Sequence, residues 1–217
     1  MNRFTTLVLA GLLAWNCLQA ETADDGWSSL FNGKDLTGWK ASENQATFSV
    51  KDGAIVAAGP RSHLFYVGEV NGASFKNFEF KADLMTKPRS NSGIYFHTQF
   101  QKNGWPRKGY EAQVNNTQGD PRKTGSLYAV KDVKKAPAKD NEWFHYHIIV
   151  NGKTITLKID GETTVEFTEA EDSPHLKRTK GRKLSGGTFA LQGHDPKSVV
   201  MYKNIFVKPL PDDEGGK

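Results

Sequence analysis

The sequence predicts an all-β protein, a two-sheet antiparallel sandwich of jelly-roll type. Apolar and polar residues alternate with a period of two between residues 47 and 208, as expected of strands with one buried face. Gly, Asn and Asp interrupt this alternation at short intervals, and no stretch has the apolar spacing of an amphipathic helix. Roughly ten to thirteen short strands in one domain are typical of two packed sheets.

Three turn signals predict hairpins along the chain. An Asp-Gly or Asn-Gly pair between two alternating segments favours a tight antiparallel turn, because these residues adopt positive φ angles readily. Such pairs occur at Asp52-Gly53, Asn151-Gly152 and Asp160-Gly161. The flanking segments are residues 46–50 and 54–58 for the first pair, and 144–150, 154–159 and 163–167 for the other two.

The remaining alternating segments predict five further strands. They cover residues 77–84, 93–100, 110–115, 188–192 and 199–207. Two stretches rich in Lys, Ala, Pro and Arg break the alternation and are predicted to be surface loops, at residues 131–141 and 173–184.

The first twenty residues have the pattern of a secretory signal peptide. Arg3 precedes an apolar run over residues 7–15, and Ala20 provides a small residue at the expected cleavage site. A lipoprotein signal ending at Cys17 is less favoured, because bulky Trp15 and polar Asn16 precede it. The run is too short to span a bilayer, so no membrane insertion is expected.

We therefore expect a secreted or periplasmic protein in three parts. These are a signal peptide at residues 1–20, a single domain at residues 21–211 and a disordered tail at residues 212–217. Cys17 is the one cysteine and lies in the predicted signal, which excludes thiol chemistry from the domain. A net charge of +5 does not indicate nucleic acid as a partner.

Polar side chains gather on one face of several predicted strands. In residues 109–116, alternation puts Glu111, Gln113 and Asn115 on one side, opposite Tyr110 and two apolar residues. A carboxylate and two amides in a row suit a polar ligand such as a sugar. The alternative is an ordinary solvated strand face, which is common in antiparallel sheets.

Two other strands repeat this pattern. Tyr95 and His97 share a face of one strand, and Gln192 and His194 lie on the polar side of another. The three strands together suggest one concave site with acid, base and hydrogen-bonding groups. Trp105, in a loop marked by Gly and Pro, could cover one face of a bound sugar.

Two histidines raise the question of a metal. His145 and His147 are two residues apart and so share a strand face, but no third ligand is identifiable in the sequence. A half-exposed strand explains them equally well. Signatures of nucleotide binding, dinucleotide binding and serine or zinc hydrolases are absent.

Taken together, the segments resemble the 3-keto-disaccharide hydrolase domain family, over about 185 residues. The resemblance begins with GWSSLFNGKDLTGWK at residues 26–40 and passes through NSGIYFH, GYEAQVNN and TGSLYAV. It ends with EWFHYHIIVNG, GGTFALQGH and YKNIFVKPL. The order and spacing of these pieces carry the resemblance, since no single piece is decisive.

The resemblance implies a concanavalin A-like jelly roll that cleaves 3-keto-glycosides. A ketone at sugar carbon 3 acidifies the hydrogen at carbon 2, so a base can start a β-elimination, and hydration completes net hydrolysis. It implies Glu111 or His194 as the base, with Gln113 and Gln192 in the site. The strand and loop patterns add Tyr95, His97, Asn115 and Trp105 as candidates for binding substrate. No cofactor is certain, although a divalent metal ion is a candidate for stabilising the enolate. An upstream sugar 3-oxidoreductase would supply the ketone.

Two other function classes stay open. A lectin-like carbohydrate-binding module could have the same fold, using Trp105, Tyr95 and Tyr110 as aromatic platforms. Binding of anionic partners through the basic loops at residues 131–139 and 177–183 is less favoured, because the net charge is small.

Overall fold

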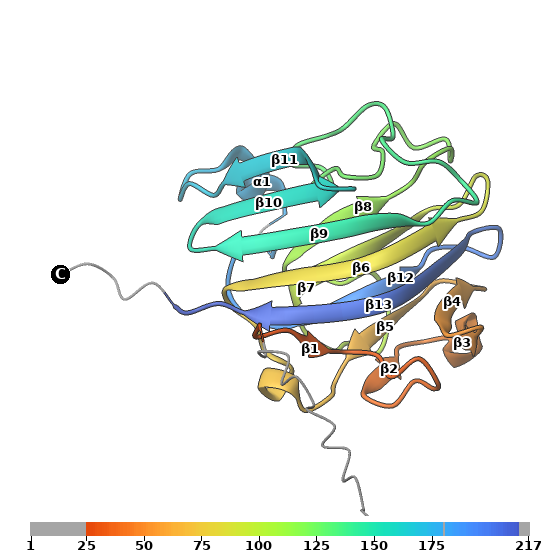
Figure 1. The fold of residues 1–217 in the computed structure, drawn as a ribbon. Coiled ribbons are helices and arrows are strands. Elements are labelled where there is room, and N and C mark those ends of the chain that lie inside the picture. The colour runs from red at the N-terminus through yellow and green to blue at the C-terminus, as the bar shows by residue number, and fades with distance from the viewer. Residues whose placement is uncertain (1–24, 180, 213–217) are drawn as a thin grey trace, which may run out of the picture.

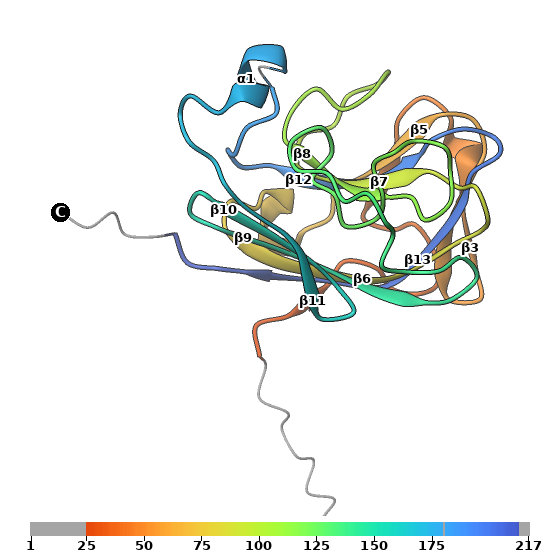
Figure 2. The ribbon, with the colours of Figure 1, turned by 90° about the horizontal axis from the view of Figure 1, so that it is seen from above.

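A computed structural model describes residues 25–179 and 181–212. Within them the chain forms two antiparallel sheets packed face to face, as predicted (Figures 1 and 2). The predicted signal peptide and residues 213–217 of the predicted tail lie outside the described residues. Asp212, placed in that tail, forms an ion pair in which its Oδ2 lies 3.2 Å from Lys76 Nζ.

The larger sheet has eight strands in the described part of the chain, in the order β11-β10-β9-β6-β13-β4-β3, with β1 paired to β13. These strands are β1 (Ser28–Ser29), β3 (Phe48–Lys51), β4 (Ala54–Ala58), β6 (Phe78–Thr86), β9 (Phe144–Asn151), β10 (Thr154–Ile159), β11 (Glu162–Thr168) and β13 (Val199–Pro209).

The smaller sheet has five strands, in the order β2-β5-β12-β7-β8. They are β2 (Trp39–Ala41), β5 (Ser62–Tyr66), β7 (Ser92–Thr98), β8 (Tyr110–Val114) and β12 (Thr188–Gly193). Short helices connect the strands: η1 (Gln45–Thr47), η2 (Val70–Ala73) and α1 (Pro174–Arg178).

The three predicted hairpins are confirmed. β3 pairs with β4, β9 with β10, and β10 with β11, each antiparallel and through a short turn. Asp52, Gly53, Asp160 and Gly161 all have positive φ, which these residue types tolerate better than most. The five other predicted strands are also present, with ends that differ by a few residues.

The sequence pattern missed β1, β2, β5 and α1. All five residues of β5 are buried, because the strand lies inside its sheet and both of its faces are covered. Such a strand shows no alternation, which is the signal that identified the others. Helix α1 is a single short turn within a stretch predicted to be a loop.

Aromatic and branched side chains fill the space between the sheets. Phe189 of β12 packs against three phenylalanine rings, with centroid distances of 4.9 Å to Phe75, 4.9 Å to Phe78 and 4.7 Å to Phe80. Phe78 and Phe80 belong to the larger sheet, so these contacts join the two layers. The core therefore uses one face of the smaller sheet and leaves its other face to the loops.

The loops and α1 lie over that other face of the smaller sheet (Figure 2). Among the described residues, no helix is long and apolar enough to cross a membrane.

Candidate functional site

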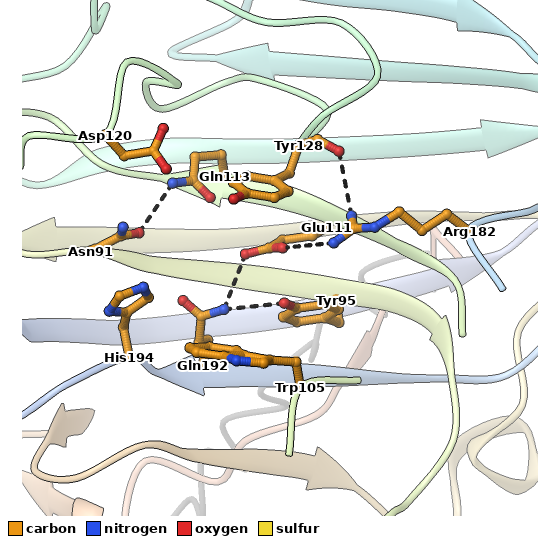
Figure 3. Close-up of a pocket in the computed structure, with 10 residues that line it drawn as sticks. All are labelled: Asn91, Tyr95, Trp105, Glu111, Gln113, Asp120, Tyr128, Arg182, Gln192 and His194. Atoms are coloured by element: carbon orange, nitrogen blue, oxygen red, sulfur yellow. Dashed lines mark hydrogen bonds and ion pairs between the residues drawn. The ribbon is translucent and has the colours of Figure 1, made fainter. Parts of the chain in front are cut away.

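A cavity of about 280 Å³ lies over the outer face of the smaller sheet (Figure 3). Strands β7, β8 and β12 provide its floor, and three loops provide its walls. Its lining side chains are aromatic, amide and charged: Asn91, Tyr95, Trp105, Glu111, Gln113, Asp120, Tyr128, Arg182, Gln192 and His194. This mixture suits a small polar ligand with an apolar face.

Strand register brings the predicted site residues together. Gly93 of β7 lies opposite Gln113 of β8, and Tyr95 lies opposite Glu111. On the other side of β7, Tyr95 lies opposite Ala190 of β12. The same antiparallel register puts Gln192, two residues further on, beside Gly93. The predicted convergence of these strands on one concave face is therefore present.

Gly93 makes room at the centre of this floor. A Cβ atom at position 93 would lie 2.6 Å from Glu111 Oε1 and 2.8 Å from Glu111 Cγ. Such distances are far below van der Waals contact, so any larger residue would displace the carboxylate.

Replacing Gly93 with alanine should cost about 1–3 kcal/mol of stability through overpacking. Thermal unfolding checks this expectation. Gly186→Ala is the matched control, because its nearest contact would be an ordinary 3.8 Å from Phe75 O. Equal effects of the two substitutions would contradict the role given to Gly93.

Glu111 is the centre of a hydrogen-bond network in the cavity (Figure 3). Gln192 Nε2 donates to Glu111 Oε1 at 3.0 Å and also approaches the Tyr95 hydroxyl at 3.2 Å. Arg182 Nη2 donates to Glu111 Oε2 at 3.4 Å, and Arg182 Nη1 donates to the backbone oxygen of Tyr128 at 3.4 Å. The carboxylate is thereby held with both oxygens in contact with donors.

Burial raises the pKa of Glu111 above its ordinary value, and the nearby Arg182 guanidinium opposes that rise. The residue is only 4% exposed. A charge in this position is costly unless paired, which explains why Arg182 lies against it.

Arg182 reaches the cavity because its loop is anchored from behind. His175 of α1 contacts the Arg182 backbone oxygen through Nε2 at 3.0 Å and the Tyr110 hydroxyl at 2.9 Å. The Tyr110 hydroxyl in turn donates to the Glu169 carboxylate, which also accepts from Leu184 N at 3.0 Å. Tyr110 is fully buried, so it provides an anchor here rather than an aromatic platform for a ligand.

His194 is paired with its neighbour Asp195. Its Nδ1 lies 2.7 Å from Asp195 Oδ2. The Asp195 carboxylate also accepts from Ser198 Oγ at 2.9 Å and from Lys197 N at 2.8 Å. Burial alone would raise the pKa of Asp195, but these hydrogen bonds outweigh it and lower the pKa.

The pairing fixes the proton on the His194 ring. An ionised carboxylate can only accept, so Nδ1 carries the hydrogen and Nε2 keeps its lone pair in the neutral ring. Within the described residues Nε2 has no hydrogen-bond partner. His194 therefore offers the cavity an oriented base.

Trp105 forms one wall of the cavity and is 42% exposed. Its ring lies 5.3 Å from the His194 ring and 5.5 Å from the His63 ring, centroid to centroid. The Arg61 guanidinium stands 5.3 Å from the indole and is itself held by Glu43 at 2.7 Å. Trp105 thus lies at the cavity together with the polar strands, and its role in binding a sugar stays a prediction.

Asn115 shapes a loop and does not line the cavity. Its Nδ2 donates to the backbone oxygens of Asp120 at 3.0 Å and Arg122 at 2.9 Å, and its Oδ1 accepts from Gln118 N at 2.9 Å. The side chain is fully buried. These bonds position Asp120, which lines the cavity in its place.

The predicted position of His97 on the concave face is wrong. Its φ is +55°, and the pairing of β12 with β7 shifts register between Thr188 and Ala190, which marks a bulge at this point. The extra residue turns the His97 ring away from the cavity and against Phe78, 5.7 Å away. There its nitrogens contact Lys76 O at 2.8 Å and Ser185 N at 3.2 Å.

In the described part of the chain, no three His, Cys, Asp or Glu side chains gather as a metal site would require. His145 and His147 lie on β9 and are each paired with a carboxylate of β6. His145 Nδ1 is 3.0 Å from Asp83 Oδ1, and His147 Nε2 is 2.8 Å from Glu79 Oε2. The prediction of a divalent metal ion in the cavity stays a prediction.

Three cavity residues were not singled out in the sequence, Asp120, Tyr128 and Arg182, and neither was Asp195, which holds the His194 ring. Asp195 directly follows His194 in the sequence, and this His-Asp pair just after a strand is the signal that could have identified it. The other three come from loops, where alternation gives no orientation.

The fold and the cavity together define a jelly-roll protein with a polar site on its smaller sheet. Three solved structures illustrate the likeness. A Parabacteroides distasonis protein provisionally assigned as a glycosyl hydrolase is 26% identical, with a TM-score of 0.74 over 90% of this chain and 99% of that one. A second such protein from the same organism is 22% identical, with a TM-score of 0.66 over 85% and 99%.

The third is a Bacillus subtilis protein of unknown function with a galectin-like fold. It is 10% identical, with a TM-score of 0.58 over 84% of this chain and 94% of that one, and it supports the fold alone. No curated protein matches the sequence.

The chain belongs to the family of 3-keto-alpha-glucoside-1,2-lyase-like domains, whose model matches residues 26–208. The resemblance drawn from the sequence is thereby confirmed.

Proposed function

We propose that this protein cleaves the glycosidic bond of 3-keto-glycosides by β-elimination at carbons 1 and 2. The observation that carries the proposal is the oriented His194-Asp195 pair at the cavity that Glu111, Gln192 and Arg182 also line, within the matched family domain. We also propose that the protein acts outside the cytoplasm on sugars that a separate oxidoreductase has oxidised at carbon 3.

The chemistry needs one base and one site for developing negative charge. His194 Nε2 takes the proton from carbon 2, and the electron pair of that C–H bond moves toward the carbon 3 ketone as an enolate. The enolate collapses to a carbon 1–carbon 2 double bond as the carbon 1–oxygen bond breaks, and the departing oxygen takes a proton. Water added at carbon 1, with a proton returned to carbon 2, gives net hydrolysis.

The residues around Glu111 suit the charged intermediate. Arg182 is a donor fixed in place before substrate binds, and it has N–H groups beyond those that contact Glu111 and Tyr128, so it can stabilise an oxyanion without rearranging. Both N–H groups of Gln192 already contact Glu111 and Tyr95, so Gln192 helps to position the carboxylate. Glu111 holds these donors and can accept a substrate hydroxyl. His194 is the better base, because both Glu111 oxygens already accept hydrogen bonds.

Incubating the protein with 3-ketotrehalose and, separately, with trehalose tests the proposal, with products followed by mass spectrometry with and without a chelator. Cleavage of the ketone alone is the expected result, and the chelator arm reports on metal need. Cleavage of neither, with saturable trehalose binding, would instead indicate a lectin-like module.

Trp105→Ala should raise KM about tenfold and change kcat little, because stacking against a sugar face contributes about 1–2 kcal/mol to binding. Trp143→Ala is the matched control, since Trp143 is also exposed at 39% and also has a cation, Lys203, over its ring at 4.1 Å. Equal KM values for both variants would remove Trp105 from the site.

A further inference from the structure

His63 of β5 is a buried histidine with no hydrogen bond on either ring nitrogen to any described residue. The residue is fully buried. A neutral imidazole always presents one N–H donor and one nitrogen acceptor, so both capacities are unmet here. Buried polar groups in proteins are nearly always paired, and an exception calls for an explanation.

The position of His63 points to the cavity. It lies directly opposite Gln192, which lines the cavity floor. Its ring contacts Tyr95 at 5.4 Å and Trp105 at 5.5 Å, and both of these also line the cavity. Of these two rings, the Trp105 indole is the one that reaches solvent, at 42% exposed against 3% for Tyr95.

The floor of the cavity holds two more unpaired polar atoms in the same row of the sheet as His63. Gln192 Oε1 and Gln113 Oε1 are buried without a partner among the described residues. Register aligns His63, Gln192, Gly93 and Gln113 in one row across four strands. A row of unmet hydrogen-bonding groups complements a ligand with several hydroxyls.

Burial lowers the pKa of His63 to about 3, with further lowering by Arg61 and His194 and an opposing effect of Glu43. The ring is therefore neutral at physiological pH. A neutral imidazole can donate and accept at once, which matches the dual character of a sugar hydroxyl.

His97 is a second buried histidine, away from the cavity, with which the hydrogen bonding of His63 can be compared. It is also buried, at 2% exposed, but both of its nitrogens are within hydrogen-bond distance of backbone groups. Of these two buried histidines, only His63, beside the cavity, has unmet hydrogen-bonding capacity on its ring.

We propose that His63 is a substrate-binding residue covered by Trp105 in the free protein, and that a sugar hydroxyl hydrogen-bonds to its ring when the indole turns aside. This inference rests on the proposed function for the identity of the substrate. The indole has space for such a movement, since it is 42% exposed.

The first test compares His63→Leu with His97→Leu. Removing an unpaired polar group should raise the thermal midpoint of His63→Leu by about 2–4 °C. The same variant should raise KM for 3-ketotrehalose and Kd for trehalose about tenfold or more. His97→Leu, which loses paired nitrogens, should lower the midpoint and leave both constants within about threefold.

A His63→Leu variant with a lower midpoint and unchanged KM and Kd would overturn the inference, because those changes indicate a structural role. Should that variant not fold, the wild-type protein gives the answer through nitrogen-15 spectra of its histidine rings. Trehalose should shift the His63 ring nitrogens and leave those of His97 in place, and unshifted His63 signals would overturn the inference. Trehalose binding needs no turnover, so this test remains decisive if the cleavage proposal fails.

Discussion

His194→Ala should lower kcat for 3-ketotrehalose by about 10²- to 10⁴-fold and change KM less than threefold. The physical reason is that a positioned general base contributes this much to proton transfer and acts only in the transition state. Asp195→Asn should reduce kcat about tenfold, since it weakens the acceptor that holds the proton on His194 Nδ1. Steady-state kinetics of both variants provide the measurement.

The protein contains its own control for this prediction. His145 also has Nδ1 against an aspartate, Asp83 Oδ1 at 3.0 Å, but it lies on the larger sheet. His145→Ala should therefore leave kcat unchanged. A His194→Ala variant with more than a tenth of the wild-type kcat would exclude His194 as the base.

Glu111→Gln should lower kcat/KM by about 10²- to 10³-fold, the loss expected when preorganised groups around a developing charge are disturbed. The substitution keeps the shape of the side chain but leaves the Arg182 guanidinium, 17% exposed, without its carboxylate. Glu162→Gln on β11, an exposed carboxylate, is the control and should leave kcat/KM unchanged.

The difference in stability between the wild type and Glu111→Gln should change with pH in a defined direction. Because burial raises the pKa of Glu111 in the folded state, the native protein binds the proton more tightly than the unfolded chain. The wild type should therefore lose stability relative to Glu111→Gln as pH rises from about 4.5 through the folded pKa. Unfolding midpoints of both proteins across pH measure this difference, and a trend in the opposite direction would contradict the assigned burial effect.

Most of the fold could be predicted because strands with one covered face leave a period of two. The hairpin turns at Asp52-Gly53 and Asp160-Gly161 and the long strands β6 and β13 all carry that signal. Strand β5 does not, because both of its faces are buried. Helix α1 is too short to leave an amphipathic period.

The site residues that could be predicted from the sequence are those on regular, paired strands. Glu111, Gln113, Gln192 and Tyr95 line the cavity because they lie on regular strands, and His194 follows directly after β12. A bulge at His97 breaks that regularity, so the His97 side chain points to the opposite side of the sheet from the cavity. The sequence alone does not reveal this bulge.

Loop contributions depend on tertiary contacts that no local pattern encodes. Arg182 belongs to a basic stretch whose sequence is typical of a solvated loop. It enters the cavity because His175 and Tyr110 anchor its backbone from the other side of β8. No sequence pattern singled out His63, because its proposed role is inferred from the hydrogen bonds that its ring nitrogens do not make.

The central claim is that cleavage begins by removal of the hydrogen at carbon 2. The most direct test compares 3-ketotrehalose with the same sugar carrying deuterium at carbon 2 of the keto ring, in a competition experiment that measures kcat/KM. A primary isotope effect together with loss of the carbon 2 label from the product is the predicted result. Cleavage without an isotope effect and with the label fully retained at carbon 2 would contradict the elimination mechanism.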